Sequence, residues 1–136
     1  MKKIFISLAA VATLAACSKS SSDLAEEGGT STSNALMGAY SGEFTRTGTP
    51  DTGYFMIDIN QARYDGSSRD PGFPGICGGY YTLQGSTIVF DDTCYAGSAK
   101  VMLEGTYNYQ KNGDSLRFWR TAGGVTDDYR MARLYR

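Results

Sequence analysis

The chain has 136 residues, a net charge of −1 and no histidine. This charge argues against a nucleic-acid binder, which needs a basic face, and the lack of histidine excludes His-ligated metals, Ser-His-Asp triads and imidazole acid–base catalysis. Beyond a short leader about 100 residues remain, enough for one small domain. The 17 Gly, 10 Tyr and 6 Phe favour short strands and tight turns over a helix bundle.

The first residues have the pattern of an export signal. Lys2 and Lys3 precede an apolar run from Ile4 to Leu14 that is interrupted only by Ser7 and Thr13. A run of this length is too short to cross about 30 Å of hydrocarbon as a helix. Its length and basic flank are typical of a secretory signal peptide.

The end of this signal has an unusual cysteine. The motif Leu14-Ala15-Ala16-Cys17 resembles the lipobox of bacterial lipoproteins. The resemblance implies that residues 1–16 are removed and that Cys17 becomes a multiply acylated N-terminus, which holds stably to a membrane. We therefore expect a lipid-anchored protein of the bacterial cell envelope, in the outer membrane, on its periplasmic face or at the cell surface. The alternative is an ordinary signal peptide with an incidental cysteine.

A polar segment follows this motif. Residues 18–34 read SKSSSDLAEEGGTSTSN and contain too few apolar side chains to fold. We expect residues 17–35 to form a lipidated, flexible tether. Its acidic residues Asp23, Glu26 and Glu27 are either a surface-sorting signal or part of a solvated spacer.

From residue 36 onward the chain alternates apolar and polar residues with a period of two, as strands do. About seven strands are predicted, at residues 40–44, 55–59, 80–83, 88–90, 101–109, 116–118 with its continuation, and 129–135. Short connections favour sequential antiparallel pairing. Residues 36–136 are therefore predicted to form an all-β domain, a small antiparallel meander barrel of about 7–8 strands. A flattened β-sandwich is the alternative.

Glycines mark the connections between these strands. Tight turns are predicted at Gln84-Gly85, Asn112-Gly113 and Gly123-Gly124. Asn-Gly is a strong hairpin signal because a type I′ turn needs positive φ at both central residues. Residues 65–79, DGSSRDPGFPGICGG, are predicted to form an irregular loop at the mouth of the barrel or over its end.

Two cysteines remain once Cys17 is set aside. In an exported protein, Cys77 and Cys94 most simply form a disulfide. A redox pair or metal site is the alternative, but the chain has neither a Cys-x-x-Cys motif nor a histidine. We expect a structural disulfide and no metal site.

Catalytic groups are not evident. The pairs Asp91-Asp92 and Asp127-Asp128 lie at predicted strand ends, where aspartate commonly serves turn geometry, and we interpret them as turn and surface acids. No serine has a histidine base to activate it. The sequence therefore predicts no enzyme and no cofactor.

Inward-facing aromatic and arginine residues form the candidate ligand site. The alternation places Arg120 and Arg133 in the same registers as inward aromatics, where each must be paired, with Glu43 or Asp58 as candidates, or must orient a polar ligand. The alternative is a filled core whose arginines reach solvent or close the barrel floor. Trp119 falls on the outer face, as a partner contact or beneath a loop. The candidate ligand-binding residues are Tyr40, Phe44, Tyr107, Tyr109, Arg120, Tyr129 and Arg133.

Three short motifs support a family resemblance. Gly38-x-Tyr40-x-Gly42-x-Phe44, Gly105-Thr106-Tyr107-Asn108-Tyr109 and Leu116-x-Phe118-Trp119-Arg120 resemble the small lipocalin-like lipoproteins of Bacteroidetes-type bacteria. The chain is shorter than true lipocalins, with Tyr40 where those have tryptophan. The resemblance implies a barrel that binds a small hydrophobic or amphipathic ligand in the envelope. The alternative function is a solid barrel that binds an envelope protein or glycan, because a small barrel can be filled by its own side chains.

Overall fold

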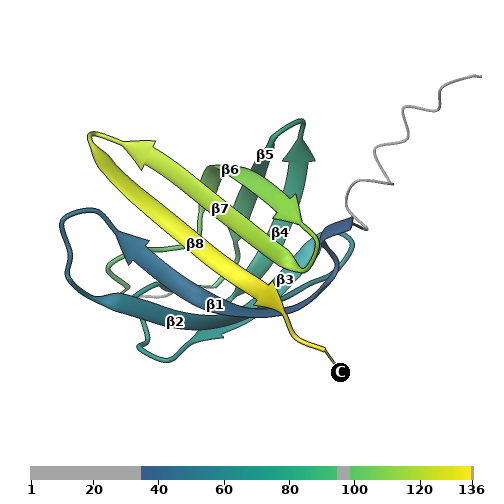
Figure 1. The fold of residues 1–136 in the computed structure, drawn as a ribbon, viewed down its shortest axis with the longest axis horizontal. Helices are drawn as coiled ribbons and strands as arrows, with labels where there is room; N and C mark the ends of the chain where they lie inside the picture. Colours follow the sequence, from purple (N-terminus) through teal and green to yellow (C-terminus); the bar gives the residue numbers. More distant parts are fainter. Residues whose placement is uncertain (1–34, 95–98, 136) are drawn as a thin grey trace, which may run out of the picture.

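The computed structural model describes residues 35–94 and 99–135, which form one closed antiparallel β-barrel (Figure 1). Each strand pairs with the next along the chain, and β8 pairs with β1 to close the barrel. The strands are β1 (Gly38–Arg46), β2 (Thr52–Ile59), β3 (Arg63–Ser68), β4 (Gly78–Gln84), β5 (Thr87–Asp92), β6 (Gly105–Asn112), β7 (Ser115–Ala122) and β8 (Val125–Arg133). The prediction of a small meander barrel is confirmed, and the sandwich alternative is wrong.

The barrel has eight strands, one more than the seven segments predicted from the sequence. The strand that the sequence interpretation missed is β3. Residues 65–68 were assigned to the irregular loop, yet they pair with β2 from Asp65 opposite Asp58 to Ser68 opposite Phe55. Small and polar residues conceal this strand, because only Tyr64 is a buried apolar residue in it. The loop itself is confined to residues 69–77.

The predicted strand at residues 101–109 is also shorter than expected. Gly105 has a φ of 85°, and β6 begins there. Val101 and Leu103 are buried, but they belong to the connection before β6 rather than to the strand. Val101 and Leu103 are two positions apart in the sequence, and both are buried at one end of the barrel. This spacing resembles the sequence pattern of a strand.

The Gly123-Gly124 turn forms where it was predicted, and the other two tight turns are each displaced by one residue. Ala122 pairs with Val125, and both intervening glycines have positive φ, at 59° and 80°. The β6–β7 turn is shifted by one residue, because Asn112 pairs with Ser115 and the turn residues are Gly113 and Asp114. Gly85, with a φ of 60°, occupies the β4–β5 turn.

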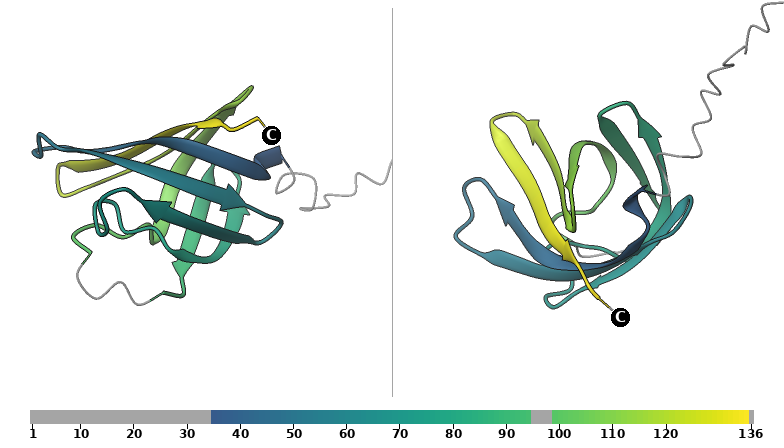
Figure 2. Two further views of the ribbon diagram at one scale, coloured as in Figure 1. Left: turned by 90° about the horizontal axis from the view of Figure 1, so that it is seen from below. Right: turned by 45° about the vertical axis from the view of Figure 1, so that its right-hand side comes forward.

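The two ends of the barrel differ (Figure 2). The terminus end carries the start of β1, the end of β8 and the short turns between β2 and β3, β4 and β5, and β6 and β7. The loop end carries the longer connections, residues 47–51, 69–77, 93–94 and 99–104, together with the β7–β8 turn. Residues 69–77 and 99–103 lie across the loop end, where the Gly75 amide donates to the Val101 carbonyl and the Leu103 amide donates to the Gly75 carbonyl at 3.0 Å.

A disulfide joins one of these loops to the barrel. Cys77 and Cys94 are bonded, with 6.0 Å between their Cα atoms. The predicted disulfide is confirmed. It links the end of the 69–77 loop to Cys94, two residues after β5, and so helps to hold this loop across the loop end of the barrel.

The N-terminal predictions fall outside the described residues. The predicted signal peptide, the predicted acylation of Cys17 and the predicted tether up to residue 34 all lie within residues 1–34. Within the described residues, Leu36 is buried and accepts a hydrogen bond from the Tyr40 hydroxyl at 2.9 Å. No helix among the described residues is long and apolar enough to cross a membrane.

Candidate functional site

The barrel interior is filled by aromatic rings. The ring of Phe90 lies 5.1 Å from those of Tyr64 and Phe118 and 5.8 Å from that of Tyr107, and Tyr107 in turn lies 5.7 Å from Tyr129. The network continues through Phe44, Phe55, Phe73 and Tyr81. These edge-on and tilted contacts run from β4 and β5 across the interior to β1 and β8, so the barrel's own side chains occupy its centre.

Tyrosine hydroxyls at the ends of this core form hydrogen bonds to other groups of the protein. The Tyr107 hydroxyl donates to the Met102 carbonyl at 3.3 Å, and the Tyr81 hydroxyl donates to the Asn60 carbonyl at 2.7 Å. Tyr64 lies 3.3 Å from both the Asp92 carboxylate and the Leu103 carbonyl. Burial raises the pKa of Tyr107 to about 12, against the opposing effect of Arg120, so its hydroxyl stays protonated.

The predicted ligand-site residues face inward, but they belong to two ends of the barrel. Tyr40, Phe44, Tyr107 and Tyr129 are fully or almost fully buried. Tyr107, Tyr129 and Arg120 gather toward the loop end around Asp127, whereas Tyr40 and Arg133 lie at the terminus end. Tyr109 is half-buried near the β4–β5 turn, where its hydroxyl donates to the Gly85 carbonyl at 3.3 Å.

The two arginines close opposite ends of the barrel. Arg120 lies 4.6 Å above the Tyr107 ring and donates to Asp127 at 3.1 Å and to the Glu104 carbonyl at 2.6 Å. Arg133 lies 5.5 Å above the Tyr40 ring and donates to the Tyr40 hydroxyl and the Met37 carbonyl. Arg120 forms its ion pair with Asp127, where the sequence interpretation expected Glu43 or Asp58.

The interpretation of Asp127 and Asp128 as turn and surface acids is wrong. Both lie within β8 and are buried, 3% and 6% exposed. Asp127 faces the interior side and is bracketed by Arg46, at 3.3 Å, and Arg120. Because adjacent strand residues point to opposite faces, Asp128 faces the outer side. There it is covered by a second pair of arginines.

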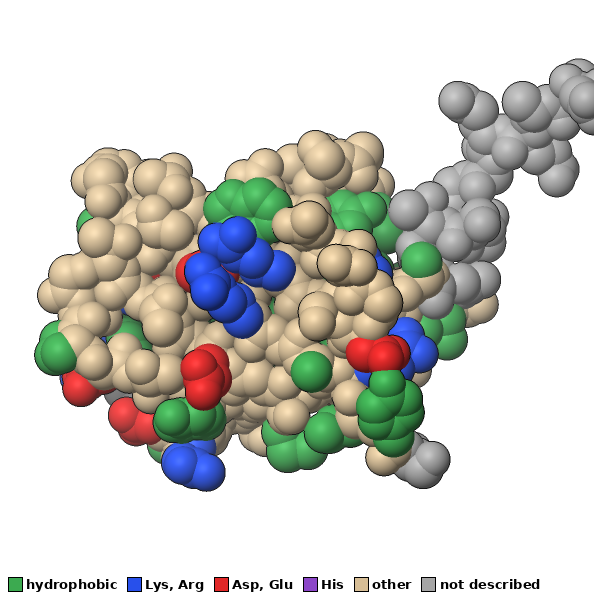
Figure 3. Space-filling model, viewed as in Figure 1, with side chains coloured by type: hydrophobic (Ala, Val, Ile, Leu, Met, Phe, Trp, Pro, Cys, Tyr) green, Lys and Arg blue, Asp and Glu red, His purple; other side chains and the backbone are tan. Residues whose placement is uncertain are grey.

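The outer pair, Arg117 and Arg130, holds Asp128 from both sides. Arg117 Nε donates to Oδ1 at 2.8 Å and its Nη2 to Oδ2 at 2.9 Å, while Arg130 Nε and Nη2 both donate to Oδ2, at 3.0 and 2.8 Å. The Arg117 guanidinium also lies 4.7 Å above the Trp119 ring. Figure 3 shows basic side chains gathered over β7 and β8. We refer to Arg117, Trp119, Asp128 and Arg130 as the outer arginine cluster.

Sequence reasoning missed this cluster, although the hairpin register contains the signal. Counting back from the Gly123-Gly124 turn places Trp119 opposite Asp128 and Arg117 opposite Arg130. The sequence interpretation placed Trp119 on the outer face, and it is half-buried there, with the Arg117 guanidinium over its ring.

The cluster controls the protonation of its carboxylate. Burial alone would raise the pKa of Asp128, but the hydrogen bonds from Arg117 and Arg130 outweigh burial and lower that pKa below its ordinary value of 3.8. A carboxyl group with a lower pKa in the folded state stabilises the fold above its unfolded value and loses that contribution as the pH falls through the folded value.

Asp128→Asn therefore lowers the free energy of unfolding near pH 7 by about 1–2 kcal/mol, since the arginines are partly exposed. The deficit relative to the wild type shrinks as the pH falls below about 4. Urea unfolding of both proteins from pH 7 to pH 2 measures this difference. A deficit that stays constant over the whole range would contradict the assignment.

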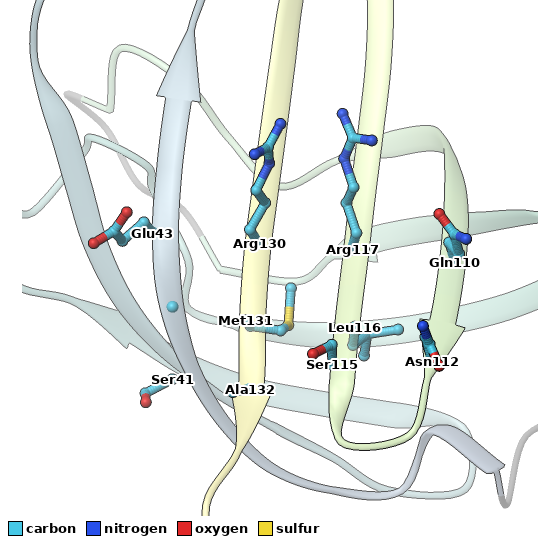
Figure 4. Close-up of a pocket in the computed structure, with 11 residues that line it drawn as sticks. Ser41, Glu43, Gln110, Asn112, Ser115, Leu116, Arg117, Arg130, Met131 and Ala132 are labelled. Atoms are coloured by element: carbon cyan, nitrogen blue, oxygen red, sulfur yellow. The ribbon is translucent and has the colours of Figure 1, made fainter.

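Two open grooves lie on the outer surface of the barrel, one on each side of β1. The first, of about 600 Å³, lies beside the outer arginine cluster, and the second has a volume of about 540 Å³. Figure 4 shows the first groove, with Arg117 and Arg130 extending side by side in the same direction. Its lining residues are Ser41, Gly42, Glu43, Gln110, Asn112, Ser115, Leu116, Arg117, Arg130, Met131 and Ala132.

Glycine at position 42 shapes both grooves. A Cβ at Gly42 would lie 2.0 Å from the Arg130 carbonyl oxygen and 2.7 Å from Met131, so only glycine permits this approach of β1 to β8. Gly42 lines both grooves, which lie on either side of the same strand. Among the residues that the structure describes, no group of three or more His, Cys, Asp or Glu side chains is arranged to hold a metal ion.

Comparison with known proteins adds no name to this geometry. No family model matches the chain, and neither a curated protein nor a solved structure is significantly similar to it.

Proposed function

We propose that this protein is a lipid-anchored lipoprotein of the bacterial cell envelope whose filled barrel binds another envelope component on its outer face, without catalysis. The observation that carries the proposal is the continuous network of aromatic rings through the interior. A barrel built to enclose a small hydrophobic ligand needs a cavity, and here rings and tyrosine hydroxyls take up that space. This favours the solid interaction module over the ligand-binding barrel.

The outer surface offers what an interaction module needs. Guanidinium groups stack over exposed or half-buried rings at three places: Arg63 over Tyr80, Arg69 over Tyr54 and Arg117 over Trp119. Arginine and aromatic side chains are enriched where proteins bind partners, since they combine large contact areas with directed hydrogen bonds. Arg117 lines one of the two grooves beside β1, and Arg69 and Tyr54 line the other.

Anchoring follows from the resemblance of residues 14–17 to a lipobox. The barrel begins at its terminus end, because β1 starts there beside the end of β8. A tether from the membrane therefore joins the barrel at that end, and the loop end and the outer face of the strands are left for partners.

Native and intact-mass spectrometry of the protein purified gently from its own host tests the proposal. We expect a mature chain that begins at Cys17, carries acyl groups and the disulfide, and holds no small molecule. Cys17→Ala is the control, and it should appear as an unacylated precursor that retains residues 1–16 and is equally empty.

Each part of the proposal can fail separately. A discrete adduct that survives desalting in both proteins would contradict the filled interaction module and restore the ligand-binding barrel. An unacylated wild-type chain would contradict the lipid anchor.

A further inference from the structure

The groove beside the outer arginine cluster combines a positive charge with neutral hydrogen-bonding groups. Two guanidinium groups share one carboxylate, Asp128, so one positive charge is left over. The Nη1 atoms of Arg117 and Arg130 make no hydrogen bond within the described chain, and the two side chains are 39% and 70% exposed. Each guanidinium group therefore keeps N–H donors beside the groove that no group of the described chain accepts.

The arginines are held in place before any ligand arrives. Asp128 fixes both guanidinium planes through four hydrogen bonds, and the Trp119 ring supports that of Arg117. A fixed guanidinium loses less conformational entropy on binding than a free one. Its fork matches the geometry of an anionic carboxylate.

The remaining groove wall is suited to hydroxyl groups. Gln110 and Asn112 from β6 contribute amides, and Ser41 and Ser115 contribute hydroxyls. Figure 4 shows the two amides across β7 from Arg130. Leu116 and Met131, which are buried, provide an apolar floor. Amides and hydroxyls around an apolar floor, with a cation at the rim, match a sugar ring that carries a carboxylate.

The fold disfavours the other occupants of such a groove. An extended peptide often binds by adding a strand to an open sheet edge, but this barrel is closed and each strand pairs on both sides. Nucleic acid requires several phosphate contacts, whereas the outer arginine cluster has one surplus positive charge.

Glu43, on β1, is the acidic residue of the groove lining. Its carboxylate points away from the guanidinium groups (Figure 4).

We propose that this groove binds an acidic oligosaccharide, whose carboxylate bonds to Arg117 and Arg130 and whose hydroxyl groups bond to Gln110, Asn112 and the two serines. The inference rests on the proposed function, since it names the class of partner bound by the outer face. It makes three residues beyond the arginine pair testable: Gln110 as a hydroxyl-binding group, Glu43 as a repelling charge, and Arg69 as an uninvolved arginine.

The experiment is calorimetric titration of the mature acylated chain in detergent micelles with oligogalacturonate. Its methyl ester, which keeps the sugar hydroxyls and removes the charge, is the matched ligand control. We expect the acid to bind at least about tenfold more tightly than the ester, and the affinity for the acid to fall as salt is added.

Four substitutions place the binding in this groove. Arg130→Gln should weaken binding of the acid about tenfold, and Gln110→Ala, which does not touch the ion pairs, should weaken both acid and ester. Glu43→Gln should strengthen binding of the acid. Arg69→Gln is the matched control, since it removes the same charge from the other groove and should leave the affinity unchanged.

Three results would overturn the inference. They are equal affinity for acid and ester, an equal loss in Arg69→Gln and Arg130→Gln, and binding of acetate as strong as that of the oligosaccharide. Absence of any binding by the wild type would also overturn it. None of these results bears on whether the barrel interior is filled. The proposed function is therefore tested separately, by mass spectrometry.

Discussion

Phe90→Ala lowers the free energy of unfolding by about 3–5 kcal/mol. Phe90 is 2% exposed, and its ring contacts those of Tyr64, Tyr81, Tyr107 and Phe118. Its removal leaves a void that rings fixed on four other strands cannot collapse to fill. Urea unfolding followed by circular dichroism measures the loss, which is a large part of the total stability of a domain of this size.

The control for this prediction is Met56→Ala on the outer face of β2. Met56 is 54% exposed, so its truncation should change stability by less than about 0.5 kcal/mol. Phe90→Leu provides a milder variant if alanine prevents folding, with an expected loss of about 1 kcal/mol. If Phe90→Ala were as stable as Met56→Ala, the interior would have to be hollow or loosely packed, and the filled barrel would be wrong.

Loss of the disulfide has the second-largest expected effect. The bond between Cys77 and Cys94 closes a loop with a sequence separation of 17, and the chain-entropy model gives about 3 kcal/mol for such a loop. The double variant Cys77→Ala/Cys94→Ala should lose this amount in urea unfolding. Its barrel should still form, because β4 and β5 also pair directly from Gly79 opposite Asp92 to Gln84 opposite Thr87.

Reductant provides the matched control for the disulfide. Wild-type protein unfolded in reductant should have the stability of the double variant, and reductant should leave the double variant unchanged. Equal stability of the oxidised wild type and the double variant would show that this cross-link does not support the fold.

The all-β class, the barrel and its antiparallel order were predictable from local patterns. Alternation in β2, with Phe55, Ile57 and Ile59 inward, is readable because one face of each strand is buried and the other is solvated. Glycine-rich turns fixed the hairpin between β7 and β8, since two-residue turns need positive φ. The disulfide followed from an even pair of cysteines in a chain whose N-terminal pattern predicts export.

The third strand could not be found in this way. Its residues Asp65, Gly66, Ser67 and Ser68 carry no apolar alternation, and pairing with β2 is what makes them a strand. The same limit applied to Asp127 and Asp128. Adjacent acids look like turn residues, and only their contacts with arginines from β1, β7 and β8 allow them to be buried within a strand.

The candidate site was likewise predictable only in part from the sequence. The sequence by itself determined which side chains face inward, because alternation fixes the face of a strand residue before any partner is known. Only the tertiary structure decided that these inward rings meet and fill the barrel, and that Arg117 and Arg130 converge on Asp128 beside an open groove. Those outcomes depend on barrel closure and cross-strand register, which bring together residues that no local pattern relates.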